Sequence, residues 1–274
     1  MPDGNASASQ VLGEVKDGIG WITLNRPEQL NTLSPELKDR LLELSSRYEH
    51  DPAVRCVVLR GNGRHFMAGG NIKEFNENLA RTDAEKADYY RGFEARVVAA
   101  HQMIYHFRRM AKPVVASIQG AVAGFGLSLV MACDLAIASD DAIFTLAYRH
   151  IGLSADGGAT YFLPRIVGER RALEIALLGE RFDAKRALDI GLLNWVVARD
   201  KLEDETAKLA RRLADGPTAA LGAAKQLIRT SFDNSWDEHS HREAETLGRM
   251  VRTEDHAEGL KAFLEKRQPA FKGR

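Results

Sequence analysis

The spacing of apolar residues predicts a chain that alternates between strands and helices through its first two thirds. Two short strand patterns, at 10–15 and 19–25, flank an Asp-Gly pair, which favours a hairpin turn. Apolar runs rich in β-branched residues then predict buried strands at 56–61 (CVVLRG), 113–118 (PVVASI), 134–139 (DLAIAS), 142–146 (AIFTL) and 192–197 (LLNWVV).

Apolar residues spaced three or four apart predict the helices. Ser34 and Pro35 are typical of an N-cap and a first helical position, and a stripe follows them at Leu37, Leu41, Leu44 and Tyr48. The segment "TDAE" at 82–85 is a capping box. It predicts the start of one long helix whose apolar face contains Val97, Ala100, Ile104 and Phe107.

Beyond residue 168 the pattern is helical almost to the end, with boundaries predicted at Pro217, Asn234 and Thr253. Strands and helices that alternate first, followed by helices alone, predict an α/β fold with a helical appendage. We therefore expect a core at 1–200 and a helical C-terminal region at 201–274.

Charge and composition exclude several classes of protein. The 274 residues contain 38 Lys plus Arg and 38 Asp plus Glu, a balance that argues against a nucleic-acid scaffold. Cys56 and Cys133 lie in apolar runs without metal-type spacing, which predicts buried thiols and no metal site. The opening "MPDGNASASQ" lacks a signal-peptide pattern, and polar residues interrupt 114–137, so we expect a cytoplasmic protein that does not enter the membrane.

Two glycine-rich loops each follow a buried strand and lead into a helix. They are "HFMAGGNIKEF" at 65–75 and "GAVAGFGLSLV" at 120–130, and neither fits a dinucleotide or P-loop motif. Glycine lets backbone approach a ligand closely, and two N–H groups from separate loops can form an oxyanion hole. The alternative is that both loops are tight connections that simply need glycine.

A lone carboxylate, Asp156, lies in the glycine-rich segment "IGLSADGGATYFLPRIVG" at 151–168. Aspartate is favoured at turns and helix N-caps, and a helical pattern begins just after Gly158. Local sequence therefore allows two interpretations, a capping residue or a catalytic acid.

Taken together, these segments resemble the crotonase (enoyl-CoA hydratase/isomerase) superfamily over nearly the whole chain. The similar segments are "LNRPEQLNTLS", "FMAGGNIKEF" and "IQGAVAGFGLSLVMACDLAIAS", in the family's order and separation. The resemblance implies a spiral of ββα units with a helical C-terminal region that forms trimers or hexamers. It also implies an acyl-coenzyme A thioester as substrate, with coenzyme A the only cofactor-like group involved.

Site residues follow from the resemblance by position. The oxyanion donors would be the backbone N–H groups of Gly70 and Phe125, where the Phe125 ring replaces the usual glycine and would narrow the acyl pocket. Asn71 replaces the family's usual aspartate and keeps a polar capping side chain. The implied coenzyme A contacts are Arg26, Ala68, Gly70, Asn71, Ile72 and Lys73.

The residues also discriminate between reactions. Family hydratases use two glutamates at the positions of Ser128 and Tyr148, so this chain lacks the hydratase acids. Asp156 matches the single acid of several family isomerases, which predicts a Δ3-to-Δ2 double-bond shift with Asp156 as proton shuttle. The alternatives are an aryl-CoA dehalogenase in which Asp156 attacks with help from His101 and Tyr148, a thioester hydrolase, and a non-catalytic acyl-CoA-binding module.

Overall fold

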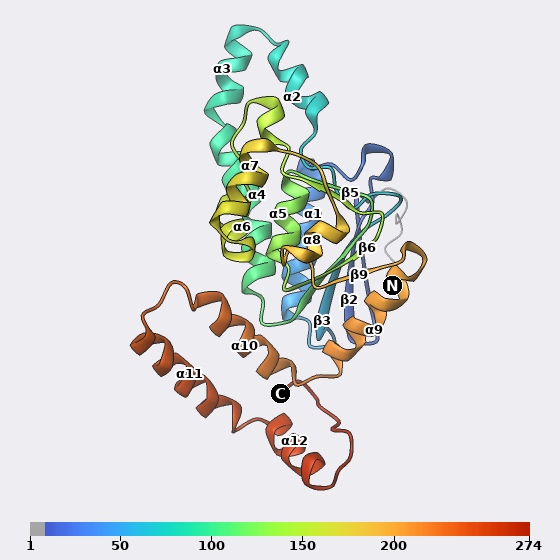
Figure 1. Ribbon diagram of the computed structural model, residues 1–274, viewed down its shortest axis with the longest axis vertical. Coiled ribbons are helices and arrows are strands. Elements are labelled where there is room, and N and C mark those ends of the chain that lie inside the picture. The colour runs from blue at the N-terminus through green and yellow to red at the C-terminus, as the bar shows by residue number, and fades with distance from the viewer. Residues whose placement is uncertain (1–8) are drawn as a thin grey trace.

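The structure, a computed structural model that describes residues 9–274, places helices around two β-sheets (Figure 1). Most of the opening segment judged above for a targeting signal lies outside the described residues. Within residues 9–274 no helix is both long and apolar enough to cross a membrane.

The larger sheet contains six strands in the described part of the chain, in the order β1-β2-β3-β4-β6-β9. The strands are β1 (Val11–Lys16), β2 (Ile19–Leu24), β3 (Cys56–Gly61), β4 (Val114–Ile118), β6 (Leu135–Ser139) and β9 (Trp195–Val197). β1 pairs antiparallel with β2, and the other pairs are parallel. The predicted hairpin is confirmed, since Asp17 and Gly18 both adopt positive φ, as a two-residue hairpin turn requires.

A smaller sheet, not predicted from the sequence, lies beside the glycine loops. Its strands are β5 (Ala121–Ala123), β7 (Ile143–Thr145) and β8 (Phe182–Asp183), in that order. Met67 of the first glycine loop forms a parallel bridge to Val122 of β5. β7 lies within the strand predicted at 142–146, whereas β5 and β8 were not predicted, because two or three residues are too few to show a period in the sequence.

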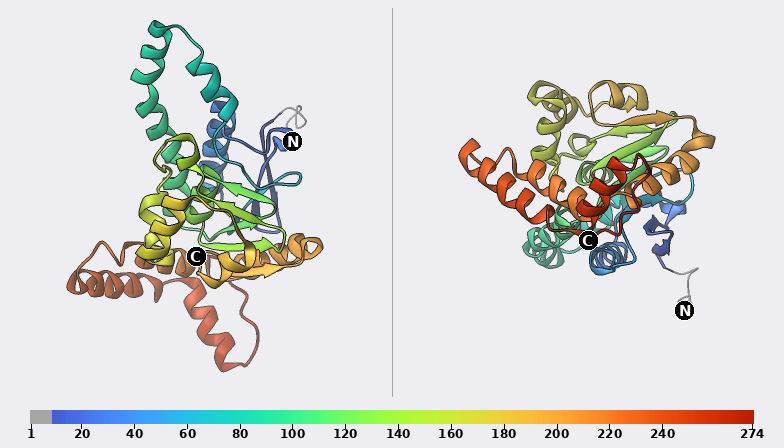
Figure 2. Two further views of the ribbon diagram at one scale, coloured as in Figure 1. Left: turned by 45° about the horizontal axis from the view of Figure 1, so that its top comes forward. Right: turned by 90° about the horizontal axis from the view of Figure 1, so that it is seen from below.

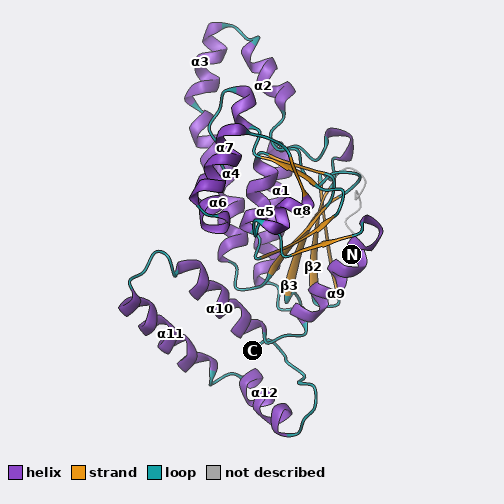
Figure 3. Cartoon of the chain, viewed as in Figure 1, coloured by secondary structure: helices purple, strands orange, loops and turns teal. Residues whose placement is uncertain are grey.

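Apolar cores lie on both faces of the larger sheet. Figure 3 shows the helices that lie on either side of its strands. One face packs against α1 (Pro35–His50), α4 (Phe93–Arg109) and α5 (Phe125–Ala132), and the other against α9 (Leu202–Ala214). Side chains of β3 point alternately to the two faces of the sheet, so Val57 and Leu59 belong to one core and Cys56 and Val58 to the other. Helices on both faces explain why these strands read as continuous apolar runs.

The predicted first helix is confirmed in detail. The Ser34 side chain accepts a hydrogen bond from the Leu37 N–H at 3.1 Å, and Pro35 occupies the first helical position. The apolar stripe at 37, 41, 44 and 48 is fully buried.

The helix predicted from residue 82 is correct at its start but is not continuous. Thr82 and Glu85 form the capping box, but α3 (Asp83–Arg91) ends at Gly92, where α4 begins. Together with α2 (Ile72–Leu79), α3 projects away from the sheets (Figure 2). Because α3 buries no residue, no packing surface keeps it collinear with α4 across a glycine.

Helices dominate the C-terminal third, as predicted. The remaining helices are α6 (Ala159–Val167), α7 (Glu169–Leu178), α8 (Ala184–Asp189), α10 (Thr218–Thr230), α11 (Trp236–Met250) and α12 (Glu254–Leu264). Helices α10 to α12 extend away from the sheets, whereas α9 packs on the larger sheet although it follows the predicted boundary at residue 200 (Figure 1). Large apolar side chains are exposed on these three helices, at Ile228, Trp236, Leu247, Phe263 and Leu264.

Candidate functional site

The two glycine loops meet in space. A Cβ atom placed on Gly69 would lie 3.4 Å from the backbone nitrogen of Phe125 and 2.9 Å from the carbonyl oxygen of Ala123. One placed on Gly124 would lie 3.8 Å from the Cα atom of Gly69. Gly69 and Gly124 also have φ values of 87° and 50°, in the left-handed region, so the contact between the loops needs glycine at both positions.

Both predicted donors lie at this junction. Among residues 9–274, neither the Gly70 N–H nor the Phe125 N–H donates to a protein acceptor. Phe125 is the first residue of α5, so its N–H has no partner inside the helix and lies at the positive end of the helix dipole. The junction therefore carries two backbone donors without a partner in the described residues, which is what an oxyanion site needs.

The Phe125 side chain is buried in the main core at 3% exposure. A Cβ atom on Gly157 would lie 3.0 Å from the Phe125 ring, which shows how closely the ring packs under the turn that carries Asp156. The ring thus connects the oxyanion junction to the loop of the candidate acid.

The Asp156 carboxylate does not cap α6. Gly158 is the N-cap residue of that helix, and only the Asp156 backbone carbonyl accepts from the Ala159 N–H. The side chain turns instead toward η2 (Tyr148–Ile151), where the Tyr148 hydroxyl donates a short hydrogen bond to Asp156 Oδ1. The capping interpretation of Asp156 is therefore wrong.

His101 of α4 holds the same turn from the other side. Its Nε2 accepts a hydrogen bond from the Gly157 N–H at 3.1 Å and lies 4.0 Å from Asp156 Oδ2. Because a backbone N–H only donates, this contact requires His101 Nε2 to be unprotonated. Within the described residues, Asp156 Oδ2 accepts no hydrogen bond, so one carboxylate oxygen stays available, and the side chain is 30% exposed.

Ser128 is a third contact, which the sequence analysis treated only as a missing acid. It is fully buried on α5, and its Oγ donates to the Asp156 backbone carbonyl at 2.9 Å. A Cβ atom on Gly157 would lie 2.7 Å from Ser128 Cβ, so the turn can approach α5 only because residue 157 is glycine. Ser128 thus restrains the Asp156 backbone, and Tyr148 restrains its side chain. His101 restrains the amide of the next residue, Gly157.

Burial raises the pKa of the Tyr148 hydroxyl far above its ordinary value of 10.0, and the adjacent Asp156 carboxylate raises it further. Tyr148 therefore remains a protonated donor through the whole neutral range.

Arg26 lies inside the protein at 9% exposure. Its guanidinium bonds to the Thr32 carbonyl oxygen at 2.8 Å and to the Gln29 side chain, within its own turn. Nearby, the Asn31 amide donates to the His65 and Phe66 carbonyl oxygens at 2.8 and 3.1 Å. Asn31, which the sequence analysis did not single out, thus joins this turn to the first glycine loop.

Some of the predicted coenzyme A contacts in the first glycine loop are bonded to the rest of the fold, and others are exposed. The Ala68 N–H donates to the Leu30 carbonyl oxygen at 3.0 Å, whereas Ile72 and Lys73 lie exposed on α2. Asn71 is the N-cap residue of α2, but its side chain makes no capping bond, so the expected cap is wrong. The ψ angle of Asn71 is 96°, whereas that of Ser34, which does cap its helix, is 163°.

A cavity of about 400 Å³, lined by two arginines and by Asp141, lies beside the first loop and was not predicted. Leu30, Ala68 and β5 line it together with Arg64, His65 and Arg181. Burial lowers the pKa of His65, and the nearby Arg64 charge lowers it further. His65 Nδ1 accepts from the Ala121 N–H at 3.0 Å, so the ring is a fixed wall of the cavity.

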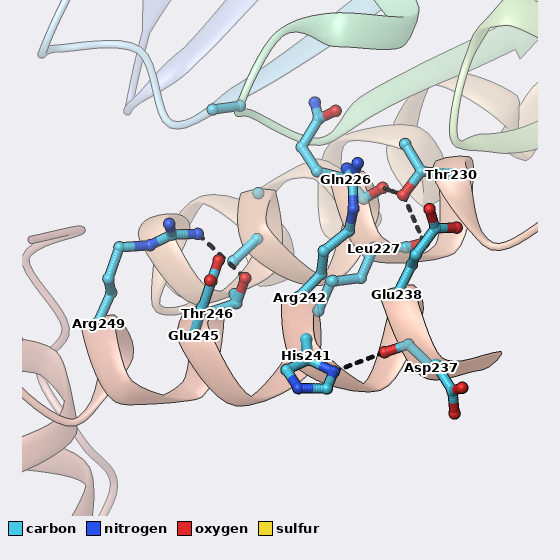
Figure 4. Close-up of a pocket in the computed structure, with 13 residues that line it drawn as sticks. Gln226, Leu227, Thr230, Asp237, Glu238, His241, Arg242, Glu245, Thr246 and Arg249 are labelled. Carbon is cyan, nitrogen blue, oxygen red and sulfur yellow. Dashed lines mark hydrogen bonds between the residues drawn. The ribbon is translucent and has the colours of Figure 1, made fainter. Parts of the chain in front are cut away.

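A larger groove of about 860 Å³ lies between α10, α11 and Ala111 (Figure 4). None of the candidate catalytic residues lines it. In residues 9–274 no three His, Cys, Asp or Glu side chains are grouped as metal ligands.

Comparisons with known proteins identify the family. A family model described as enoyl-CoA hydratase/isomerase matches residues 14–274. The 1,2-epoxyphenylacetyl-CoA isomerase of Escherichia coli strain K12 is 34% identical over 264 residues, which cover 96% of this chain and 98% of the relative. The (E)-benzylidenesuccinyl-CoA hydratase of Thauera aromatica is 35% identical over 262 residues, covering 95% and 98%.

Solved structures agree. An enoyl-CoA hydratase/isomerase from Mycobacterium abscessus superposes with a TM-score of 0.89 at 35% identity, covering 96% of this chain and all of that chain. The predicted crotonase fold is confirmed, while relatives named as isomerases, hydratases and a dehalogenase occur at similar identity. The chain belongs to the enoyl-CoA hydratase/isomerase family of the crotonase superfamily.

Proposed function

We propose that this protein shifts a Δ3 double bond of an acyl-CoA thioester to the Δ2 position. The observation that carries the proposal is Asp156, whose Oδ1 is held by Tyr148 while Oδ2 is left without a hydrogen bond in the described residues. A restrained carboxylate with one available oxygen suits a base that must remove and then return a proton.

The reaction needs one base and one oxyanion site. Asp156 Oδ2 takes a proton from C2, and the electrons move into a dienolate whose oxygen is bound by the Gly70 and Phe125 N–H groups. The protonated Asp156 then delivers that proton to C4, which leaves the double bond between C2 and C3. Atoms and charge balance without a cofactor or an added water.

Tyr148 and His101 act on Asp156 rather than on the substrate. Tyr148 orients the carboxylate, and His101, with its Nε2 occupied by the Gly157 N–H, holds the turn. Hydration is disfavoured because Ser128 and Tyr148 supply no carboxylate pair.

Coenzyme A would bind along the first glycine loop. Lys73 is exposed there, and the cavity beside Ala68 adds Arg64 and Arg181 as candidate phosphate contacts. Arg26 and Asn31 would support the loop from within, since both are buried.

The C-terminal helices support the expected homotrimer or hexamer. Their large apolar side chains at Ile228, Trp236, Leu247, Phe263 and Leu264 are mostly exposed, and a second copy of the chain would cover them. Sedimentation analysis should give a defined oligomer that Phe263→Glu dissociates.

The decisive experiment is Asp156→Asn. The amide keeps an acceptor for Tyr148 and the size of the side chain but cannot take a proton. Isomerisation of a 3-enoyl-CoA, followed by the absorbance of the conjugated product, should fall by at least roughly 10²-fold. Thermal unfolding and acyl-CoA binding should be nearly unchanged. Full activity in Asp156→Asn would contradict the proposal, and an aspartyl adduct with a haloaryl-CoA in mass spectrometry would favour the dehalogenase.

A further inference from the structure

A buried cluster of charges lies away from the candidate site, where α10 meets the body of the protein. Lys225 Nζ lies 2.8 Å from Asp134 Oδ2, and an Arg229 guanidinium nitrogen lies 2.7 Å from Asp134 Oδ1. The Lys225 side chain is 6% exposed and the other two are 17% exposed. The Val114 N–H also donates to Asp134 Oδ2 at 2.8 Å, which connects the cluster to the start of β4.

The α10 side chains in this cluster also bind backbone carbonyl groups at the C-terminal ends of two helices. Lys225 donates to the Phe107 carbonyl oxygen at 2.8 Å, and Gln226 donates to that of Arg109 at 2.6 Å, at the end of α4. Arg229 donates to the Ala132 and Cys133 carbonyl oxygens at 3.1 and 3.0 Å, at the end of α5.

Such carbonyls have no partner within their own helix, and cations bind well to this negative end of the dipole. A single helix thus caps both α4 and α5, and it lies across their ends in Figure 1. The approach is close, since a Cβ atom on Gly222 would lie 2.3 Å from the Ala111 carbonyl oxygen.

The two capped helices are the ones that carry the candidate site. α4 carries His101, and α5 carries Phe125 at its first residue and Ser128 one turn later. α5 has only eight residues, so a displacement at its C-terminal end moves the Phe125 N–H with it. His101 and Ser128 contact the same turn, so the relative position of α4 and α5 determines how that turn is held.

The free-energy cost of burying these charges also suggests a role other than stability. Burial lowers the pKa of Lys225, an effect that the Asp134 charge opposes. A buried ion pair contributes little net stability compared with apolar packing, so its value here lies in the several contacts that it makes at fixed positions. The arrangement thus favours precision of placement over stability.

We propose that Lys225 and Arg229 are positioning residues, which align the Phe125 N–H and the Asp156 turn by holding the C-terminal ends of α4 and α5. This inference rests on the proposed function for its kinetic consequence. A displacement of about 1 Å at the oxyanion site is enough to lower the rate, since catalysis depends steeply on geometry.

The first measurement needs no substrate. In the isotope-labelled full-length protein, the amide resonances of Phe125 and Gly157 should shift in Lys225→Met and Arg229→Gln. The matched control is Val58→Ala, which removes apolar volume from the core under α9 and lowers stability without touching α4 or α5. Those two amide resonances should not move in Val58→Ala.

The second measurement follows the reaction. In Lys225→Met and Arg229→Gln, kcat should fall about tenfold with KM nearly unchanged, while Val58→Ala at a similar loss of Tm keeps its kcat. Resonances that stay unmoved in folded Arg229→Gln would overturn the inference whatever the enzyme does. A wild-type protein without isomerase activity would instead count against the proposed function, while shifted resonances would still support the positioning role.

Discussion

The Tyr148 hydroxyl donates a hydrogen bond to Asp156 Oδ1, eight residues later in the chain. The two residues lie on η2 and on the loop before α6, and the contact holds the carboxylate at the candidate site rather than at the helix start. One oxygen of Asp156 is thereby engaged, while the other accepts no hydrogen bond from residues 9–274.

The Tyr148 hydroxyl should affect the isomerisation rate as a protonated donor. We expect Tyr148→Phe to lower the isomerisation rate about tenfold, because the carboxylate loses its orientation. Since burial raises the pKa of Tyr148 above 10.0, the wild-type rate should show no alkaline decline from this group below pH 10.

The same pKa shift predicts a stability difference. Below pH 10 the hydroxyl is protonated in both folded and unfolded chains, so the gap in unfolding free energy between wild type and Tyr148→Phe should be constant. Above pH 10 only the unfolded chain releases the proton, and the wild-type advantage should shrink. Urea unfolding from about pH 8 to 11 checks this, and a gap that widens with pH would contradict it.

Substitutions of His101 separate a positioning role from a catalytic one. In His101→Gln a carbonyl oxygen can still accept the Gly157 N–H, so activity should stay within about threefold of wild type. In His101→Phe the buried N–H loses its partner, which should cost about 1–3 kcal/mol of stability and lower the rate roughly tenfold. If His101 were the base, both variants should lose about 10²-fold or more in stopped-flow assays.

Hydration of crotonyl-CoA should be very slow compared with isomerisation of a 3-enoyl-CoA. Ser128 and Tyr148 cannot deprotonate water near neutral pH, and both are engaged with Asp156. The loss of conjugated thioester absorbance measures hydration directly. Rapid hydration by the wild-type protein would show that the assignment of the site is wrong.

Coenzyme A affinity should depend on the cations near the first loop. We expect Lys73→Ala and Arg64→Ala each to weaken acyl-CoA binding by roughly 1.5–3 kcal/mol, through loss of a charge-assisted phosphate contact. Calorimetric titration with acyl-CoA and with its 3′-dephospho form would identify which residue contacts the 3′-phosphate. The variant that lacks this residue should bind the two ligands with equal affinity. Lys208→Ala, an exposed change on α9, should bind like wild type.

The sequence by itself determined the elements whose causes are local. The cap at Ser34, the capping box at Thr82 and the hairpin at 17–18 depend on neighbours within four residues, and all are confirmed. The two glycine loops were predicted for the same reason, since a turn that needs positive φ selects glycine wherever it lies.

Only the tertiary structure decided which side chains contact Asp156. Ser128, His101 and Tyr148 lie 28, 56 and 8 residues from their partners in the turn, on three different elements. The break at Gly92 and the burial of Arg26 likewise depend on what packs against them. Contacts between distant segments arise from the packing of α4, α5 and η2 around one core, and no local pattern encodes that packing.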